Sequence, residues 1–258
     1  MKLKGYKSSW PNIFKALVLR FTIGRYGRNN IGFMWTFAEP LVLCLGVMVI
    51  WSFTKGRYEH GLDLVAFVFT GYMPLTLWRH LTGTMVNVLR FVKFLTIFRG
   101  VTLFDILIVR LITEYIAVSG SALIVFVVLF SFGVLSVPHD FLLMLQGWIV
   151  MGLLGASFGF LVAAASECTE IIERVMQPFQ YFLIPLCGCF YMVEWLPDAV
   201  KPYAIYVPTV HSYEMIRMGY FGPTIIAHYE MVYPICFSLV MAGLGFFLFE
   251  RVKDHVEA

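Results

Sequence analysis

A small set of charged residues interrupts the long apolar runs of this sequence. Glu39, Arg79 and Glu114 stand inside runs of mostly apolar residues, and an acidic cluster spans 167–173. Ionisable residues inside a membrane span are costly and mark transport pathways or proton relays. Proton-coupled carriers usually place several acids or histidines within their spans. Glu39 alone is therefore weak support for a proton relay. Pro40 follows Glu39 directly, so we expect the two residues to bend the first apolar run near its entrance.

Motifs that support catalysis are absent from the sequence. It contains no G-x-x-x-x-G-K-[ST] phosphate loop, no H-E-x-x-H and no G-x-S-x-G. The six histidines are scattered and form no ligand cluster. Cys187 and Cys189 point away from each other on a helix, which is poor geometry for a metal or a disulfide. The sequence therefore predicts no catalytic residue, no metal site and no ATPase of its own.

The composition indicates a membrane protein. Of 258 residues, 60% are hydrophobic and 14% charged, with a mean hydropathy of +0.80. Soluble domains are about 45–50% apolar and about 25% charged. The apolar runs are continuous rather than alternating, which excludes a lipid-facing β-barrel. The net charge of +3 and the lack of a dense basic patch predict no nucleic-acid partner. The N-terminus lacks a cleavage site, so we expect no removable signal peptide.

We expect an all-α polytopic fold with six transmembrane helices. A span needs about 20 apolar residues, and the candidates cover residues 31–53, 64–89, 105–132, 141–165, 175–193 and 231–249. Thirteen Lys and Arg residues fall on the side of the termini and four on the opposite side. The excess of positive charge predicts that both termini are cytoplasmic. The expected parts are a cytoplasmic N-terminus over 1–30, a transmembrane domain over 31–249 and a cytoplasmic tail over 250–258.

Three segments are too polar or too broken to span. Residues 10–28 alternate apolar and basic positions at helical spacing and predict an amphipathic helix in the cytoplasmic interface; an ordinary basic flank is the alternative. Residues 90–105 predict a short amphipathic cytoplasmic helix that docks on another protein, with a solvated connector as the alternative. Residues 194–227 are rich in Tyr and Pro and predict two short re-entrant helices on the outer side.

Small residues give the fourth apolar run one smooth face. Gly155, Gly159 and Ala163 recur every four residues. This spacing allows close packing of helices, either within one chain or between two copies.

The stretch that opens the first apolar run resembles a family signature. Arg25-Tyr26-Gly27, then Ile31-Gly32-Phe33-Met34-Trp35, then Glu39-Pro40 resembles the pattern R-[YF]-G-x-x-x-[LI]-G-x-x-W-x-x-x-E-P of the membrane subunit of bacterial polysaccharide ABC exporters. The Glu-Pro ending is more similar to the capsular branch than to the O-antigen branch. The layout of the whole chain agrees with this family. One departure lies at 97–102, where relatives often carry two prolines that this chain lacks.

The resemblance implies a half-transporter of the type-2 ABC exporter fold in the bacterial inner membrane. Two copies would form one pathway, driven by a separate ATP-binding cassette subunit that binds ATP and Mg. The chain itself would hold no cofactor. The family's cargo is a lipid-linked acidic capsular polysaccharide, which passes to a periplasmic adaptor and an outer-membrane channel.

Three groups of site residues follow from the resemblance and the residue types. Arg20, Arg25 and Arg28 would hold the interfacial helix at anionic headgroups, or receive the phosphate and carboxylates of the substrate, with Glu39 fixing Arg25 or Arg28. The expected pore aromatics are Trp35, Phe37, Phe179, Tyr181, Phe182, Phe190 and Tyr191. The expected ATPase-docking residues are Arg90, Phe91, Phe94, Leu95, Phe98 and Arg99.

Two other functions remain open on the sequence. The chain is alternatively an exporter subunit for O-antigen or teichoic acid, against which the Glu-Pro pair discriminates weakly. It is alternatively an ion-coupled secondary transporter, whose transport would survive without any ATPase.

Overall fold

The computed structural model describes residues 10–26, 42, 46, 49–50, 58–59, 61–92 and 101–257. This part of the chain is almost entirely helical, and its regular helices and strands are the following: α1 Trp10–Tyr26, β1 Tyr58–Glu59, β2 Leu62–Asp63, α3 Leu64–Gly83, α4 Val88–Val92, α5 Leu103–Ser131, α6 Phe141–Cys168, α7 Glu170–Leu183, α8 Lys201–Ala204, α9 Pro208–Phe221 and α10 Val232–Glu257. The two short strands pair antiparallel, with Tyr58 opposite Asp63. Short 3-10 turns cover Val193–Trp195 and Gly222–Thr224.

Three of the described helices are long and apolar enough to cross a membrane. They are α5, α6 and the Val232–Lys253 part of α10. They coincide with the third, fourth and sixth expected spans, so these segments are confirmed as helices long and apolar enough to cross a membrane. The second expected span holds α3, which ends at Gly83 and is followed by the separate short helix α4. The first expected span lies outside the described residues, apart from isolated positions, so the six-span architecture stays a prediction.

Local caps define where the main helices begin. Asp63 accepts hydrogen bonds from the amides of Val65 and Ala66 at the start of α3. Thr102 and Asp105 form a reciprocal capping box at the start of α5. Asp140 accepts from the amide of Leu143 at the start of α6. Each cap satisfies backbone donors that a helix leaves unpaired at its N-terminus.

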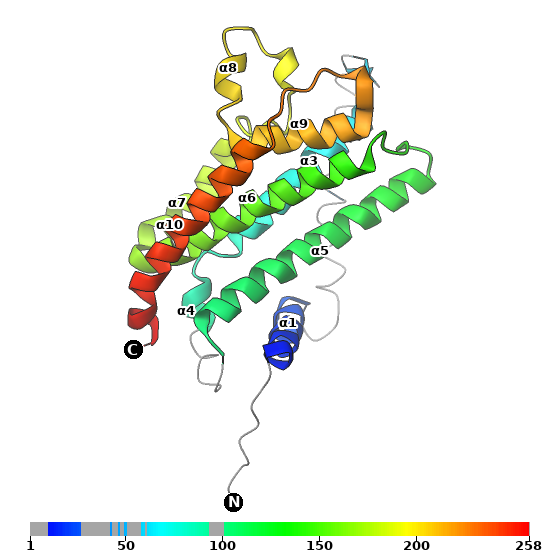
Figure 1. Cartoon of the computed structure of the whole chain (residues 1–258). Helices are drawn as coiled ribbons and strands as arrows, with labels where there is room; N and C mark the ends of the chain where they lie inside the picture. Colours follow the sequence, from blue (N-terminus) through cyan, green and yellow to red (C-terminus); the bar gives the residue numbers. More distant parts are fainter. Residues whose placement is uncertain are drawn as a thin grey trace, which may run out of the picture.

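Helix α6 is the centre of the bundle. It packs against α10, α9 and α3 (Figure 1). A Cβ added at Gly159 would overlap the carbonyl oxygen of Leu81 on α3, and one at Gly155 would lie 2.9 Å from Leu81 Cδ1. Ala163 on the same face is fully buried. The predicted smooth face of small residues therefore serves packing within the chain, against α3.

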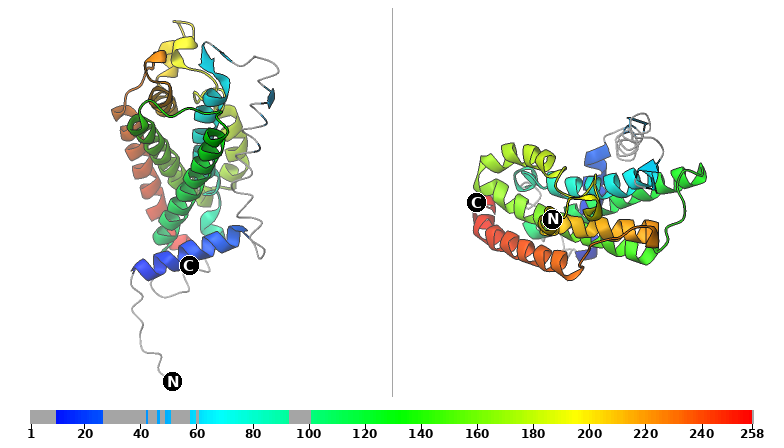
Figure 2. Two further views of the ribbon diagram at one scale, coloured as in Figure 1. Left: turned by 90° about the vertical axis from the view of Figure 1, so that its right-hand side faces the viewer. Right: turned by 90° about the horizontal axis from the view of Figure 1, so that it is seen from above.

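Helix α1 lies across one end of the bundle. Figure 2 shows it running crosswise to the long helices, at the same end as the C-terminus. Leu17 is buried, and Phe14 and Phe21 pack against the core. Lys15 and Arg20 are exposed. A helix is thus present over most of the predicted segment, with Phe14, Leu17 and Phe21 on the bundle, and its place in the cytoplasmic interface stays a prediction.

Helix α7 differs from the expected fifth span. It begins at Glu170, ends at Leu183 and has 14 residues, whereas the apolar pattern predicted a helix over 175–193. The chain turns after Leu183, and Gly188 adopts a φ of +93° that favours glycine. Pro178 is accommodated inside α7, whereas Pro185 and this glycine follow its end and do not continue the helix. The segment 194–227 holds α8 and α9 at the end of the bundle opposite α1 (Figure 1).

Candidate functional site

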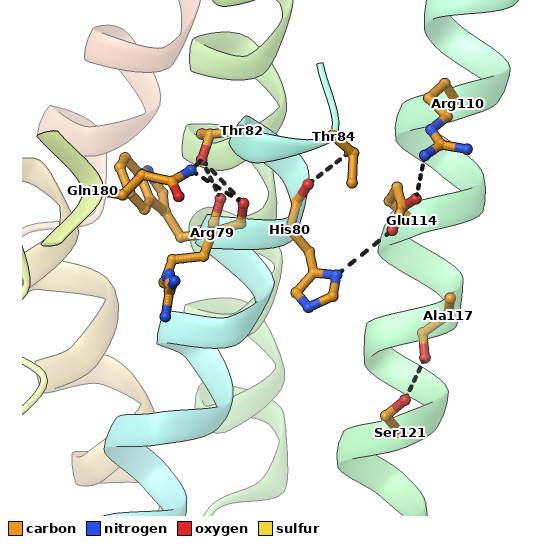
Figure 3. A network of polar contacts seen from close by, with 10 residues as sticks. Arg79, His80, Thr82, Thr84, Arg110, Glu114, Ala117, Ser121 and Gln180 are labelled. Atoms are coloured by element: carbon orange, nitrogen blue, oxygen red, sulfur yellow. Dashed lines mark hydrogen bonds and ion pairs between the residues drawn. The ribbon is translucent and has the colours of Figure 1, made fainter. Parts of the chain in front are cut away.

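A buried carboxylate joins α5 to α3. Glu114 is 1% exposed, and its Oε1 lies 3.2 Å from Nη2 of Arg110, one turn away on α5. Its Oε2 lies 3.8 Å from Nδ1 of His80 on α3 (Figure 3). The guanidinium of Arg110 also lies over the ring of Phe21, 5.2 Å from its centroid. The contacts of Glu114 therefore connect α5 to α3, and the contact of Arg110 with Phe21 adds α1 to this network.

A second polar contact joins α3 to α7. The buried Gln180 side chain donates from Nε2 to Thr82 Oγ1 over 2.7 Å and to the carbonyl of Arg79 over 3.3 Å. The Arg79 guanidinium lies over the Tyr181 ring, 4.9 Å from its centroid. Because both Gln180 and Tyr181 are on α7, these contacts fix the register of α7 on α3.

An ion-pair cluster gathers where α4 meets the junction of α6 and α7. Arg90 Nη2 donates to the carbonyl of Ser166 over 3.4 Å. Its Nε lies 3.8 Å from Glu167 Oε2, and its Nη1 lies 3.8 Å from Glu173 Oε2. Half-exposed pairs of this length stabilise the fold little, but they tie α4 to the start of α7.

Two fully buried charges on α9 organise the opposite end of the bundle. Arg217 donates from Nη1 to the carbonyls of Gly188 and Tyr191, over 2.8 and 2.5 Å, and from Nη2 to that of Cys189 over 2.5 Å. Its Cζ stacks 4.1 Å from the centroid of the Phe67 ring. Glu214 accepts from the amides of Val193 and His228, each over 3.0 Å. The turn after α7 is thus built around α9.

A surface triad lies beside these buried charges. Glu194 Oε2 is 2.7 Å from His228 Nε2, and its Oε1 accepts from Lys201 over 3.4 Å. The hydrogen bonds from His228 and then Lys201 lower the pKa of Glu194 below its ordinary value. The described residues contain no group of His, Cys, Asp and Glu that could hold a metal. The arrangement is therefore one of structural charges and helix contacts.

Comparison with known proteins decides the family. The chain is 31% identical to the capsule polysaccharide export inner-membrane protein CtrC of Neisseria meningitidis, over 95% of this chain and 92% of CtrC. It is 28% identical over the same 95% to the capsule polysaccharide export inner-membrane protein BexB of Haemophilus influenzae. It is 20% identical over 93% of its length to the polysialic acid transport protein KpsM of Escherichia coli. No model of a protein family matches the chain.

This chain belongs to the family of capsule polysaccharide export inner-membrane proteins. The expected family is confirmed, and with it the location in the inner membrane. The sequence similarity to CtrC extends over nearly the full length of both chains. Membership also accords with a transport role rather than a catalytic one.

The predicted entrance residues of this capsule export protein are described only in part. Arg20 is exposed on α1, and Arg25 belongs to the same helix. Arg28 and Glu39 lie outside the described residues, so the pairing of Glu39 with Arg25 or Arg28 stays a prediction.

The described members of the predicted pore aromatics are all at least partly exposed. Phe179 is 37% exposed and stacks on Phe158 of α6, with centroids 5.8 Å apart, and the Tyr191 hydroxyl donates to the carbonyl of Leu186. Tyr181 and Phe182 are 54% and 72% exposed, and Phe190 is 38% exposed. Trp35 and Phe37 lie outside the described residues.

The predicted docking residues lie mostly outside the described part of the capsule export protein. Arg90 is described and makes the cluster above, and Phe91 belongs to α4. Phe94, Leu95, Phe98 and Arg99 lie outside it.

Sequence reasoning missed the buried role of Arg217. The charge count assigned Arg217 to an outer loop, whereas it is fully buried on α9. Nothing in the spacing identifies its three carbonyl partners, because they follow from the turn after α7. The contact between Arg110 and Glu114 had a signal, since residues four apart on a helix face each other.

Proposed function

We propose that this chain is the membrane subunit of an ATP-driven exporter that carries lipid-linked acidic capsular polysaccharide across the bacterial inner membrane. The observation that carries the proposal is the 31% identity with CtrC over nearly the whole chain. The relation to KpsM supports an acidic cargo, because KpsM is a polysialic acid transport protein. Export of the polymer is the function that these relatives share by name.

Two copies of the chain form the pathway. Helix α7 buries only Met176 and Gln180 within its own chain. It exposes Gln177 and Tyr181 together with Phe182. A helix face that mixes amide, phenol and aromatic groups is poorly suited to lipid and well suited to a water-filled cavity beside a second copy. Aromatic rings there would contact the apolar C–H faces of sugars.

ATP and Mg are bound by a separate cassette subunit. The segment that begins at Arg90 is its docking site, and α4 provides the described start of that segment. Because Arg90 is paired with Glu167 and Glu173, movement of α4 would reach the first turn of α7. A rigid-body shift of this kind is a common way to transmit a partner's closure.

The termini face the cytoplasm. Helix α1 and the C-terminus lie at one end of the bundle (Figure 1), as an even number of spans requires. The six-span architecture includes the first apolar run at 31–53. The end with α8 and α9 then faces the periplasm, where an adaptor and an outer-membrane channel receive the polymer.

The test of this function is genetic complementation. Deletion of the gene in its host should remove capsule from the cell surface and leave polymer inside the cells, measured by staining intact and permeabilised cells. Expression of the intact chain should restore surface capsule. Normal surface capsule in the deletion strain would contradict the function.

The docking segment has its own test. Changing Phe94 and Phe98 to Asp should abolish export and release the ATPase subunit from the purified complex. The matched control is Phe132→Asp, because Phe132 is 80% exposed at the opposite end of α5. Equal loss of the ATPase subunit in both variants would contradict docking at this segment.

A further inference from the structure

Arg79 and His80, adjacent residues on α3, face different helices. His80 points to α5, where Glu114 already carries two basic neighbours, His80 itself and Arg110. Arg79 points the other way, toward α7 (Figure 3). Consecutive residues of a helix are about 100° apart around its axis, which explains the divergence.

Arg79 meets no carboxylate in the described part of the chain. Its contact there is the Tyr181 ring, 4.9 Å from Cζ. Its Nε is buried and has no hydrogen-bond partner among these residues. A guanidinium has five N–H donors. The face of an aromatic ring attracts the positive charge but does not accept in-line hydrogen bonds from these donors. The side chain therefore has N–H donors for which the described residues supply no carboxylate acceptor.

The position of Arg79 is fixed by the packing around it. Gln180 donates to the Arg79 carbonyl and to Thr82, which locks α7 beside this turn of α3. Trp78 packs on Phe158, and Phe158 stacks on Phe179 of α7. A charge held rigidly at the α3–α7 contact is preorganised for binding.

Tyr181, which contacts Arg79, also lines a shallow recess on the surface of α7. The recess has a volume of about 600 Å³ and is lined by Glu170, Glu173, Arg174, Gln177, Pro178 and Tyr181. Its two carboxylates already have partners, since Glu170 lies 3.7 Å from Arg174 and Glu173 lies 3.8 Å from Arg90. Arg79, whose guanidinium contacts the Tyr181 ring, forms no ion pair with any of the described residues.

We propose that Arg79, covered by Tyr181, is an oxyanion-binding site at the α3–α7 contact that holds a phosphate or carboxylate group of the exported molecule. The inference rests on the proposed function. Guanidinium groups bind both anions through paired N–H bonds. Arg79 lies four residues from the end of α3, about 6 Å along the helix axis. Displacement of the Tyr181 ring would admit the anion.

The test measures binding to the intact chain in nanodiscs of phosphatidylcholine. One arm titrates a fluorescent phosphatidic acid, which presents a phosphate at headgroup level, and the other titrates a soluble oligogalacturonate, which presents carboxylates. The variants are Arg79→Gln and Arg79→Lys. The matched control is Arg174→Gln, because Arg174 lines the same recess but is 81% exposed and paired with Glu170.

Arg79→Gln should weaken binding in one arm by about tenfold, the change that corresponds to about 1.4 kcal/mol. Arg174→Gln should change it by less than about twofold, and Arg79→Lys should be intermediate because it keeps the charge and loses the paired donors. The arm that responds identifies the source of the anion. Equal affinities of the wild-type chain and Arg79→Gln in both arms would overturn the site. If Arg79→Gln does not fold, wild-type affinity of Arg79→Lys in both arms would overturn it.

Export in cells separates this inference from the proposed function. If Arg79→Gln binds both probes normally while the wild-type chain restores capsule, the site is wrong and the proposed function stands. If the wild-type chain restores no capsule while Arg79→Gln still weakens binding, the site stands and the proposed function is wrong.

Discussion

Replacing Glu114 with Gln should destabilise the folded chain by about 2 kcal/mol. The carboxylate is 1% exposed and lies 3.2 Å from Arg110 and 3.8 Å from His80. Removing one partner of a fully buried ion pair costs about 3–5 kcal/mol, because the other charge is left uncompensated. Arg110 is 20% exposed, so water screens part of that charge and the expected loss is smaller.

The chain offers a matched control in Glu170→Gln. Glu170 and Arg174 are also four residues apart on one helix, at 3.7 Å, but they are 70% and 81% exposed. Exposed helix pairs contribute about 0.3–0.5 kcal/mol. Unfolding in mixed micelles by titration with SDS, followed by tryptophan fluorescence, gives both free energies. The double variant Arg110→Gln with Glu114→Gln should lose at least about 1 kcal/mol less than the sum of its single variants.

The reasoning fails if the burial of Glu114 does not make its replacement more destabilising than that of the exposed Glu170. Losses for Glu114→Gln and Glu170→Gln within about 0.5 kcal/mol of each other would refute it. Strict additivity of the Arg110 and Glu114 variants would refute the ion pair itself.

Three further predictions concern packing and the surface triad. Arg217→Met should leave the carbonyls of 188–191 unpaired, cost about 3 kcal/mol and raise hydrogen exchange in that turn. Gly159→Ala should force α6 away from α3 and cost about 1–3 kcal/mol in SDS unfolding, whereas Gly120→Ala, which has open space around it, should cost nothing measurable. Folding lowers the pKa of Glu194. The stabilisation of the fold by its ionised carboxylate is therefore complete above the ordinary pKa of Glu and is lost as the pH falls through the lower pKa of the folded state. The hydrogen-exchange protection factors at 193–195 should therefore fall only in that acidic window, and a fall at neutral pH would contradict it.

The sequence predicted the long apolar helices well. α5, α6 and α10 begin within two residues of the expected starts, because long apolar runs next to Thr102 and Asp140 leave little freedom in where a helix starts. The motif of Arg25 to Pro40 carried the family, which the similarity to CtrC confirms.

The sequence did not predict the end of α7 or the partners of the buried charges. Helix α7 stops at Leu183, before Pro185 and Gly188, and the following turn is held by Arg217 through contacts between residues 26 to 29 positions apart. Glu114 was identified as a candidate without its partner, although Arg110 stands at the favourable spacing. Arg79 and His80 are adjacent in the sequence, and only the packed structure shows that Arg79 contacts α7 whereas His80 contacts α5.

The most direct test of the account is purification of the tagged chain from host membranes in mild detergent, with ATP hydrolysis measured on the eluate. We expect a stoichiometric partner with a phosphate-loop motif, active in hydrolysis, together with two copies of this chain. After reconstitution into vesicles, polymer transport should require ATP. A pure chain that hydrolyses no ATP and still transports polymer without it would contradict the account and indicate a secondary transporter.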